Sequence, residues 1–204
     1  IFRNISIYGQ HRSPMYYSKA VMLRTGISNI EFNNCILLIP TFVSATNIPG
    51  QLSAVYSPSG NQIDNIRILN CLVYGGSAGI YLRGIGDRIT IKNNEIIETD
   101  NYGIYLYYNN FNEISNNYIT QRNTANLTLI NFYGIYLYQS KGDYIRNNKI
   151  HLYQTEYGIY LSYATKFNNS HLLIYNNEII APVLGNNYGI YMTSGCNDIK
   201  LLHN

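Results

Sequence analysis

The chain has 204 residues and a net charge of +3, and 12% of its residues are charged, against about 25% in an ordinary soluble domain. So small a charge imbalance does not suggest nucleic-acid binding, and a hydrophobic content of 46% excludes intrinsic disorder. Residues 36–39, the longest aliphatic run, end at Pro40, far short of the ~20 apolar residues of a membrane span. We expect one domain over 1–204. Because the sequence starts at Ile1 without Met, we expect a piece of a longer chain.

A short motif recurs along the chain. Weak copies occur at 20–23 and 54–56. Later copies read Gly-Ile-Tyr-Leu from Gly79, Gly103, Gly134 and Gly158, and Gly-Ile-Tyr-Met from Gly189. Successive glycines are 24, 31, 24 and 31 residues apart. Alternation with a period of two predicts a strand with Ile and Leu on one face and Tyr on the other.

A second motif follows each copy of the first. Its members are asparagine pairs at 33–34, 93–94, 116–117, 147–148 and 176–177, with single asparagines at Asn70 and Asn204. Asparagine tolerates the left-handed backbone conformation of a sharp turn, and stacked asparagines can hydrogen-bond from coil to coil. The pairs therefore predict a bend and an asparagine ladder at one turn.

Each unit reads as three short strands, such as 79–82, 89–91 and 96–97, and no amphipathic helical stretch of ten residues occurs. Strands this short form a core only by stacking on identical units. The sequence therefore predicts an all-β fold, a parallel β-solenoid of about eight coils with three short strands per coil.

The two motifs together resemble the right-handed parallel β-helix proteins of the pectate-lyase-like superfamily, from about Ala20 to Asn204. That superfamily includes polysaccharide lyases, glycosidases, epimerases, phage tailspikes and adhesins. The resemblance implies extracellular or cell-surface localisation and a ligand site along the face of the first strand.

We expect the outward tyrosines of that strand to form a two-column surface. Tyrosine has a flat apolar ring and a polar rim, which suit the faces of sugars. The alternative is that tyrosine simply favours strands and stacks well in ladders. The predicted ligand-binding residues are Tyr81, Tyr105, Tyr107, Tyr136, Tyr138, Tyr160 and Tyr191.

Three further features lead to expectations. The tyrosines before the glycines are in phase with Ile and Leu, which predicts core residues that point inward or cap the corner; they are Tyr102, Tyr133, Tyr157 and Tyr188. Cys35 and Cys71 follow ladder asparagines on consecutive coils, either as a disulfide or as buried thiols. Long insertions at 35–53, 118–133 and 162–170 are either walls of a binding site or tolerated changes in loop length.

Catalytic candidates are fewer. Glycosidases need two carboxylates about 5–9.5 Å apart. Asp100 and Glu156 precede the first strand two coils apart, about 10 Å by strand spacing. Arg83 is the only basic residue among the outward positions, and the resemblance implies a basic residue in lyases. The alternative is that these are solvated turn residues.

No Asp cluster on neighbouring coils supports a Ca²⁺ site, and the histidines share no column, so we expect neither a metal nor another cofactor. The leading hypothesis is a secreted or cell-surface segment whose tyrosine face binds a polysaccharide or cell-surface glycan. The alternatives are a carbohydrate-active enzyme (a lyase, epimerase or glycosidase) and a purely structural shaft. Expected partners are the glycan and the rest of a longer chain, without nucleic acid or membrane insertion.

Overall fold

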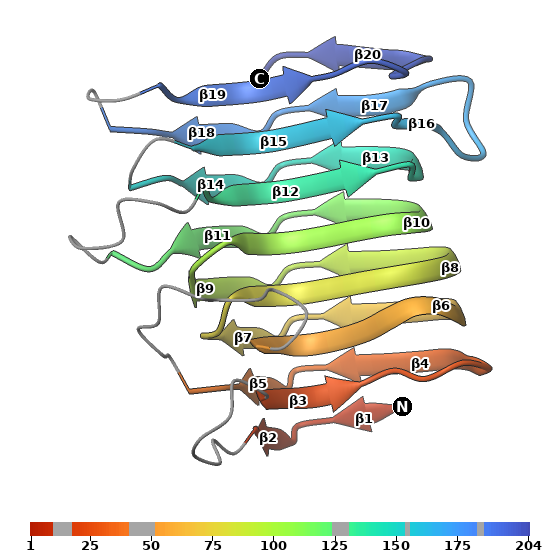
Figure 1. Cartoon of the computed structure of the whole chain (residues 1–204), viewed down its shortest axis with the longest axis vertical. Coiled ribbons are helices and arrows are strands. Elements are labelled where there is room, and N and C mark those ends of the chain that lie inside the picture. Colours follow the sequence, from red (N-terminus) through yellow and green to blue (C-terminus); the bar gives the residue numbers. More distant parts are fainter. Residues whose placement is uncertain (10–17, 41–51, 124–130, 154–155, 183–185) are drawn as a thin grey trace.

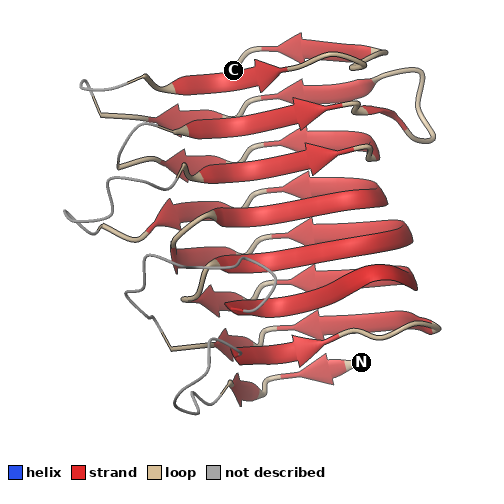
Figure 2. Cartoon of the chain, viewed as in Figure 1, coloured by secondary structure: helices blue, strands red, loops and turns tan. Residues whose placement is uncertain are grey.

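The computed structural model describes residues 1–9, 18–40, 52–123, 131–153, 156–182 and 186–204. These residues form strands, turns and bends, stacked in parallel from the N-terminal to the C-terminal end (Figures 1 and 2). No helix in the described ranges is long and apolar enough to cross a bilayer.

The strands form two parallel sheets, one of 13 strands and one of 7. In the large sheet, each coil begins with a strand that contains a copy of the first motif, and we call these the tyrosine strands. They are β3 (Ser18–Met22), β6 (Leu52–Leu69), β8 (Ala78–Lys92), β10 (Tyr102–Ser115), β12 (Tyr133–Tyr138), β15 (Tyr157–Ser162) and β19 (Tyr188–Met192). The second row of this sheet contains β1 (Phe2–Arg3), β4 (Ile27–Asn33), β13 (Lys141–Arg146), β16 (Thr165–Lys166), β17 (Leu172–Tyr175) and β20 (Ile199–Leu202). The small sheet contains β2 (Ser6–Tyr8), β5 (Ile36–Leu38), β7 (Leu72–Tyr74), β9 (Glu95–Thr99), β11 (Tyr118–Gln121), β14 (Lys149–His151) and β18 (Glu178–Ile180).

The first two predicted strands of a coil are not always separate. In β6, β8 and β10 they continue as single strands of 18, 15 and 14 residues that also supply the second row of the large sheet. They are separate in the later coils, where β12 and β13, for example, are distinct. The pairing of β8 with β10 shifts register between Tyr107 and Glu113, so the shape of this corner changes there.

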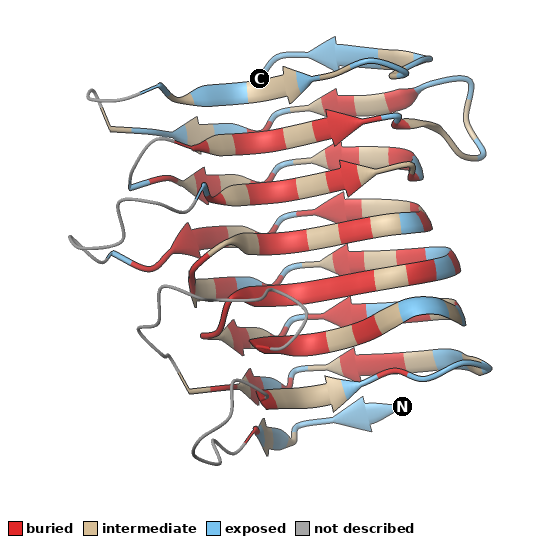
Figure 3. Ribbon diagram, in the orientation of Figure 1, coloured by how far each residue is buried: buried red, intermediate tan, exposed pale blue. Residues whose placement is uncertain are grey.

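The predicted alternation forms the core. Ile104 and Leu106 are fully buried, whereas Tyr105 between them is only half-buried. Partners in register repeat this pattern from coil to coil, as in Ile104 with Ile135 and Leu106 with Leu137. Figure 3 shows buried residues concentrated in the middle coils and exposed ones toward both ends. The weak copies of the motif also belong to the stack, since Val21 pairs with Val55 in register.

The asparagine turn is confirmed at the pairs 93–94, 116–117, 147–148 and 176–177. At 33–34 the turn begins one residue later than predicted, because Asn33 is the last residue of β4 and Asn34 is left-handed. The turn contains an exposed outer ladder, in which Asn116 donates to Asn93 and Asn93 donates to Asn70, and a buried inner ladder. The first residue of each turn is left-handed, with φ between 52° and 56° at Asn4, Asn34, Asn70, Asn93, Asn116, Asn147 and Asn176. The second residue forms an inner ladder in which each side-chain amide donates to the next side-chain oxygen at 2.9–3.0 Å. The inner ladder consists of Asn94, Asn117, Asn148, Asn177 and Asn204.

Below Asn94, cysteines take the place of the inner ladder. Cys71 and Cys35 are buried free thiols, and burial raises the pKa of the Cys71 thiol to about 11. The disulfide alternative is therefore not realised in this structure.

Candidate functional site

The outward face of the tyrosine strands is covered by stacked rings. Tyrosines in register on successive coils form a central column with centroid distances of 4.4 to 6.0 Å. This column consists of Tyr56, Tyr81, Tyr105, Tyr136, Tyr160 and Tyr191. The predicted phase of these residues is confirmed.

A second column lies beside the central one and consists of tyrosines that the sequence pattern predicts to be core residues. These tyrosines are half-buried or exposed and stack on one another at 4.9–5.3 Å. The prediction that they are core residues was wrong. The flanking column consists of Tyr102, Tyr133, Tyr157 and Tyr188.

The glycine after each flanking tyrosine explains this error. A Cβ atom on Gly103 would lie 2.4 Å from Cγ2 of the buried Ile119, so Gly103 faces the interior. Ile104 faces the interior as well. Two consecutive inward residues shift the alternation, and Tyr102 consequently lies outside.

A third, shorter stack completes the surface. Tyr107 and Tyr138 stack at 5.0 Å, and the Arg83 guanidinium lies 5.1 Å from the centroid of the Tyr107 ring. At the N-terminal end, the Lys19 ammonium lies 4.7 Å from the Tyr56 ring centroid. We call the three tyrosine stacks together the tyrosine wall.

The rings of the wall pack in a herringbone arrangement. On the same coil, the ring of the flanking column meets that of the central column at 69° to 89°, with centroids 5.0–5.3 Å apart. Within a column, the centroids of stacked rings lie 4.4–6.0 Å apart. Aromatic carbons in contact lie only about 3.5–4.0 Å apart, so these stacked rings are offset from one another. Neighbouring tyrosines therefore cover much of each ring face, which leaves ring edges and hydroxyls for a ligand.

The hydroxyls of Tyr102, Tyr105 and Tyr136 remain neutral at physiological pH. Burial raises the pKa of Tyr136 to about 12 and also raises the pKa of Tyr105 and of Tyr102. Of the buried polar atoms without a hydrogen-bond partner in the described residues, none is a tyrosine hydroxyl. The wall is thus an uncharged array of groups that both donate and accept hydrogen bonds.

The predicted ligand-binding tyrosines are not equally accessible. Tyr81 is only 7% exposed, so it supports the stack more than it meets a ligand. Tyr105, Tyr136, Tyr160 and Tyr191 are half-buried, as are Tyr107 and Tyr138.

Of the three catalytic candidates, Asp100 and Glu156 lie just before tyrosine strands, whereas Arg83 lies toward the other end of such a strand. Asp100 forms an ion pair with Arg122, with Oδ1 to Nε at 3.1 Å, and its side chain is 1% exposed. Glu156 is fully buried. Arg83 is in register with Tyr107, five residues beyond Tyr102 and about 16 Å along the strand. The structure does not bring Arg83 together with the two acids, and catalysis by these residues stays a prediction.

The insertions divide between described and undescribed residues. Those at 35–53 and 118–133 include 41–51 and 124–130, which lie outside the described residues. The insertion at 162–170 is held by Asp143, whose Oδ1 accepts hydrogen bonds from the backbone amides of Asn168 and Asn169 at 2.6 and 3.0 Å. In the ranges that the structure covers, no group of three or more His, Cys, Asp or Glu residues could hold a metal ion.

The fold and the wall define a class of protein, the parallel β-solenoids, here with an aromatic outer face. The family model described as right handed beta helix region matches residues 52–204. The chain therefore belongs to the right-handed β-helix family. No curated protein and no solved structure matches it significantly.

Proposed function

We propose that the tyrosine wall binds a polysaccharide. The chain presents this wall outside the cell or at the cell surface. The observation that carries this proposal is the regular repeat of neutral hydroxyls and ring edges from coil to coil. A polymer of sugar units is a repeating array of hydroxyls, so one contact can recur along the wall.

The composition of the wall favours a ligand rich in hydroxyl groups. No carboxylate occupies the described positions of its three stacks, and its cations, Lys19 and Arg83, lie against rings. Hydrogen-bond donors and acceptors that are held in place lose little conformational entropy when a ligand binds. The herringbone packing holds the tyrosine hydroxyls in this way.

The test removes a single hydroxyl and leaves the stack in place. In Tyr136→Phe the ring remains between Tyr105 and Tyr160, so the fold is retained. Tyr144→Phe is the matched control, because Tyr144 is also half-buried but lies on β13, in the second row of the large sheet.

Binding is measured by affinity electrophoresis through gels that contain pectin, xylan, alginate, dextran or mannan. We expect Tyr136→Phe to weaken retention on at least one polysaccharide by about threefold to tenfold, as the loss of one hydrogen bond predicts. Tyr144→Phe should leave retention unchanged. Equal retention of all three proteins, or retention on none of the gels, would refute the proposal and favour a purely structural shaft.

A further inference from the structure

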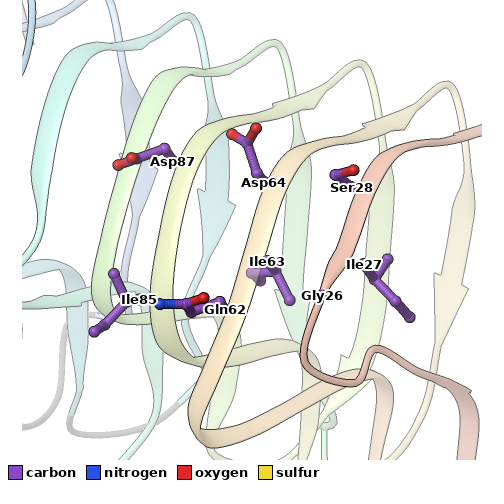
Figure 4. A pocket seen from close by; sticks show the side chains of 8 residues that line it. All are labelled: Gly26, Ile27, Ser28, Gln62, Ile63, Asp64, Ile85 and Asp87. Atoms are coloured by element: carbon purple, nitrogen blue, oxygen red, sulfur yellow. The ribbon is translucent and has the colours of Figure 1, made fainter.

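A groove opens at the corner where the tyrosine strands turn into the second row of the large sheet (Figure 4). Its volume is about 310 Å³, and it crosses three neighbouring coils, which places it at the lower end of the size range of ligand pockets. At its N-terminal edge, a Cβ atom on Gly26 would have no heavy atom within 4 Å, so the corner is open there.

Two rows of side chains line this groove. Ser28, Asp64 and Asp87 form a polar row, since each is in register with the next. In the row beside it, Gln62 is in register with Ile85, and Ile27 and Ile63 also line the groove. Ile85 is 61% exposed, which leaves an apolar surface beside the carboxylates.

Both carboxylates are held in place by neighbouring side chains. Asp64 accepts a hydrogen bond from Nε of Arg88 at 3.1 Å and a second from Nη2. This pairing keeps the pKa of Asp64 below its usual value. Asp87 accepts a hydrogen bond from the amide of Asn110.

The chemistry of the groove restricts its ligand. Ionised carboxylates only accept hydrogen bonds, and each retains free lone pairs after binding one partner. One cation, Arg88, faces two acids, so the groove disfavours anions. Its ligand must donate hydrogen bonds on one side and present an apolar surface on the other.

We propose that the groove binds one neutral hexose unit. The apolar face of the sugar lies against Ile85, and two adjacent hydroxyls donate to Asp64 and Asp87, whose strands are about 4.8 Å apart. The ligand class rests on the proposed function. Tyr81, Arg83, Ile85 and Asp87 follow one another at every second position of β8, so the groove continues the tyrosine wall around the corner.

The experiment measures binding of cellobiose, lactose and maltose to the whole chain by saturation-transfer NMR and calorimetry in the presence of EDTA. Asp87→Asn removes one acceptor, and Ile85→Ser removes the apolar surface. Both residues are exposed, so the fold is retained. Glu178→Gln is the control, because Glu178 is an exposed acid that pairs with Lys149 at 3.1 Å, far along the stack.

We expect at least one disaccharide to bind, and we expect Asp87→Asn and Ile85→Ser each to weaken it about tenfold. Glu178→Gln should bind like the parent chain. The proposal is overturned if no disaccharide binds, if the groove variants bind like the parent, or if binding requires added calcium chloride.

The failures of the two proposals are distinguishable. If Tyr136→Phe weakens polysaccharide retention while Asp87→Asn leaves disaccharide binding intact, the wall is a binding surface and the groove is not. If Asp87→Asn abolishes disaccharide binding while Tyr136→Phe changes nothing, the groove is the site and the wall is structural.

Discussion

Individual side chains in the inner asparagine ladder make more hydrogen bonds than their size suggests. Asn117 donates to the Ile91 carbonyl oxygen at 3.0 Å and to Oδ1 of Asn148 at 2.9 Å. Its own Oδ1 accepts from the backbone and the side-chain amides of Asn94, both at 3.0 Å. Because Asn117 is 1% exposed, water cannot replace these bonds.

We therefore predict that Asn117→Ala lowers the free energy of unfolding by about 2–5 kcal/mol, because it leaves buried donors and acceptors unpaired. Asn116→Gly is the matched control: glycine tolerates φ of 52°, and the bond lost to Asn93 is exposed, so less than about 1 kcal/mol should be lost. Urea denaturation followed by circular dichroism measures both. Equal losses in the two variants would show that the inner ladder contributes no more to stability than the exposed first position of the turn.

The motif glycines also differ in what surrounds them. A Cβ atom on Gly134 would lie 2.6 Å from the Gly158 carbonyl oxygen and 2.5 Å from Cγ2 of Ile150. At Gly189, in the last copy of the motif, the nearest atom would be 3.9 Å away.

Gly134→Ala should consequently lower the free energy of unfolding by about 1–3 kcal/mol through overpacking, whereas Gly189→Ala should be nearly neutral. Thermal denaturation of the two variants side by side checks this difference. If both variants have the melting temperature of the parent chain, the space around Gly134 accommodates a methyl group and the overpacking argument is wrong.

At the scale of elements, the tyrosine strands are joined by aromatic contacts as well as by the sheet. Each close ring pair contributes about 0.5–1.5 kcal/mol beyond its buried area. The same packing raises the pKa values of Tyr105, Tyr136 and Tyr160, chiefly through burial. The folded state thus favours the neutral phenol.

Stability should depend on alkaline pH with a definite sign. The unfolded chain loses tyrosine protons near the ordinary pKa of 10, whereas Tyr105, Tyr136 and Tyr160 in the folded wall retain them to higher pH. Stability is fully present below that value and falls as the pH rises above it. Denaturant titrations from neutral pH upward, with phenolate absorbance as a second signal, test this. Phenolate formation near pH 10 at Tyr105, Tyr136 and Tyr160 of an intact fold would contradict it.

The same strands show which elements could be predicted from the sequence. Ile104, Tyr105 and Leu106 alternate as the period-two pattern requires, so the core and the central column followed directly. The flanking column did not, because the inward direction of Gly103 depends on Ile119 of the following strand. The alternation of residues along one strand cannot predict a contact with a residue of another strand.

At the scale of the whole molecule, repetition made the solenoid predictable, since the same two motifs recur along the chain. Places where coils differ were not predictable. The groove lies at a corner where the pairing of strands shifts register at the next coil. The spacing of Asp64 and Asp87, 23 residues, equals that of Asn70 and Asn93, so the sequence could have indicated that these two carboxylates are neighbours. The ion pair of Asp100 with Arg122 depends equally on how one coil lies on the next.

The central claim is that the wall is the surface that meets the glycan. The most direct measurement is an NMR titration of the tyrosine-labelled chain with the polysaccharide that best retains it. We predict shifts of the ring signals of Tyr105, Tyr136 and Tyr160, and none for Tyr144 and Tyr175 on the second row of the large sheet. Unmoved wall signals, or equal shifts at all these tyrosines, would contradict the account.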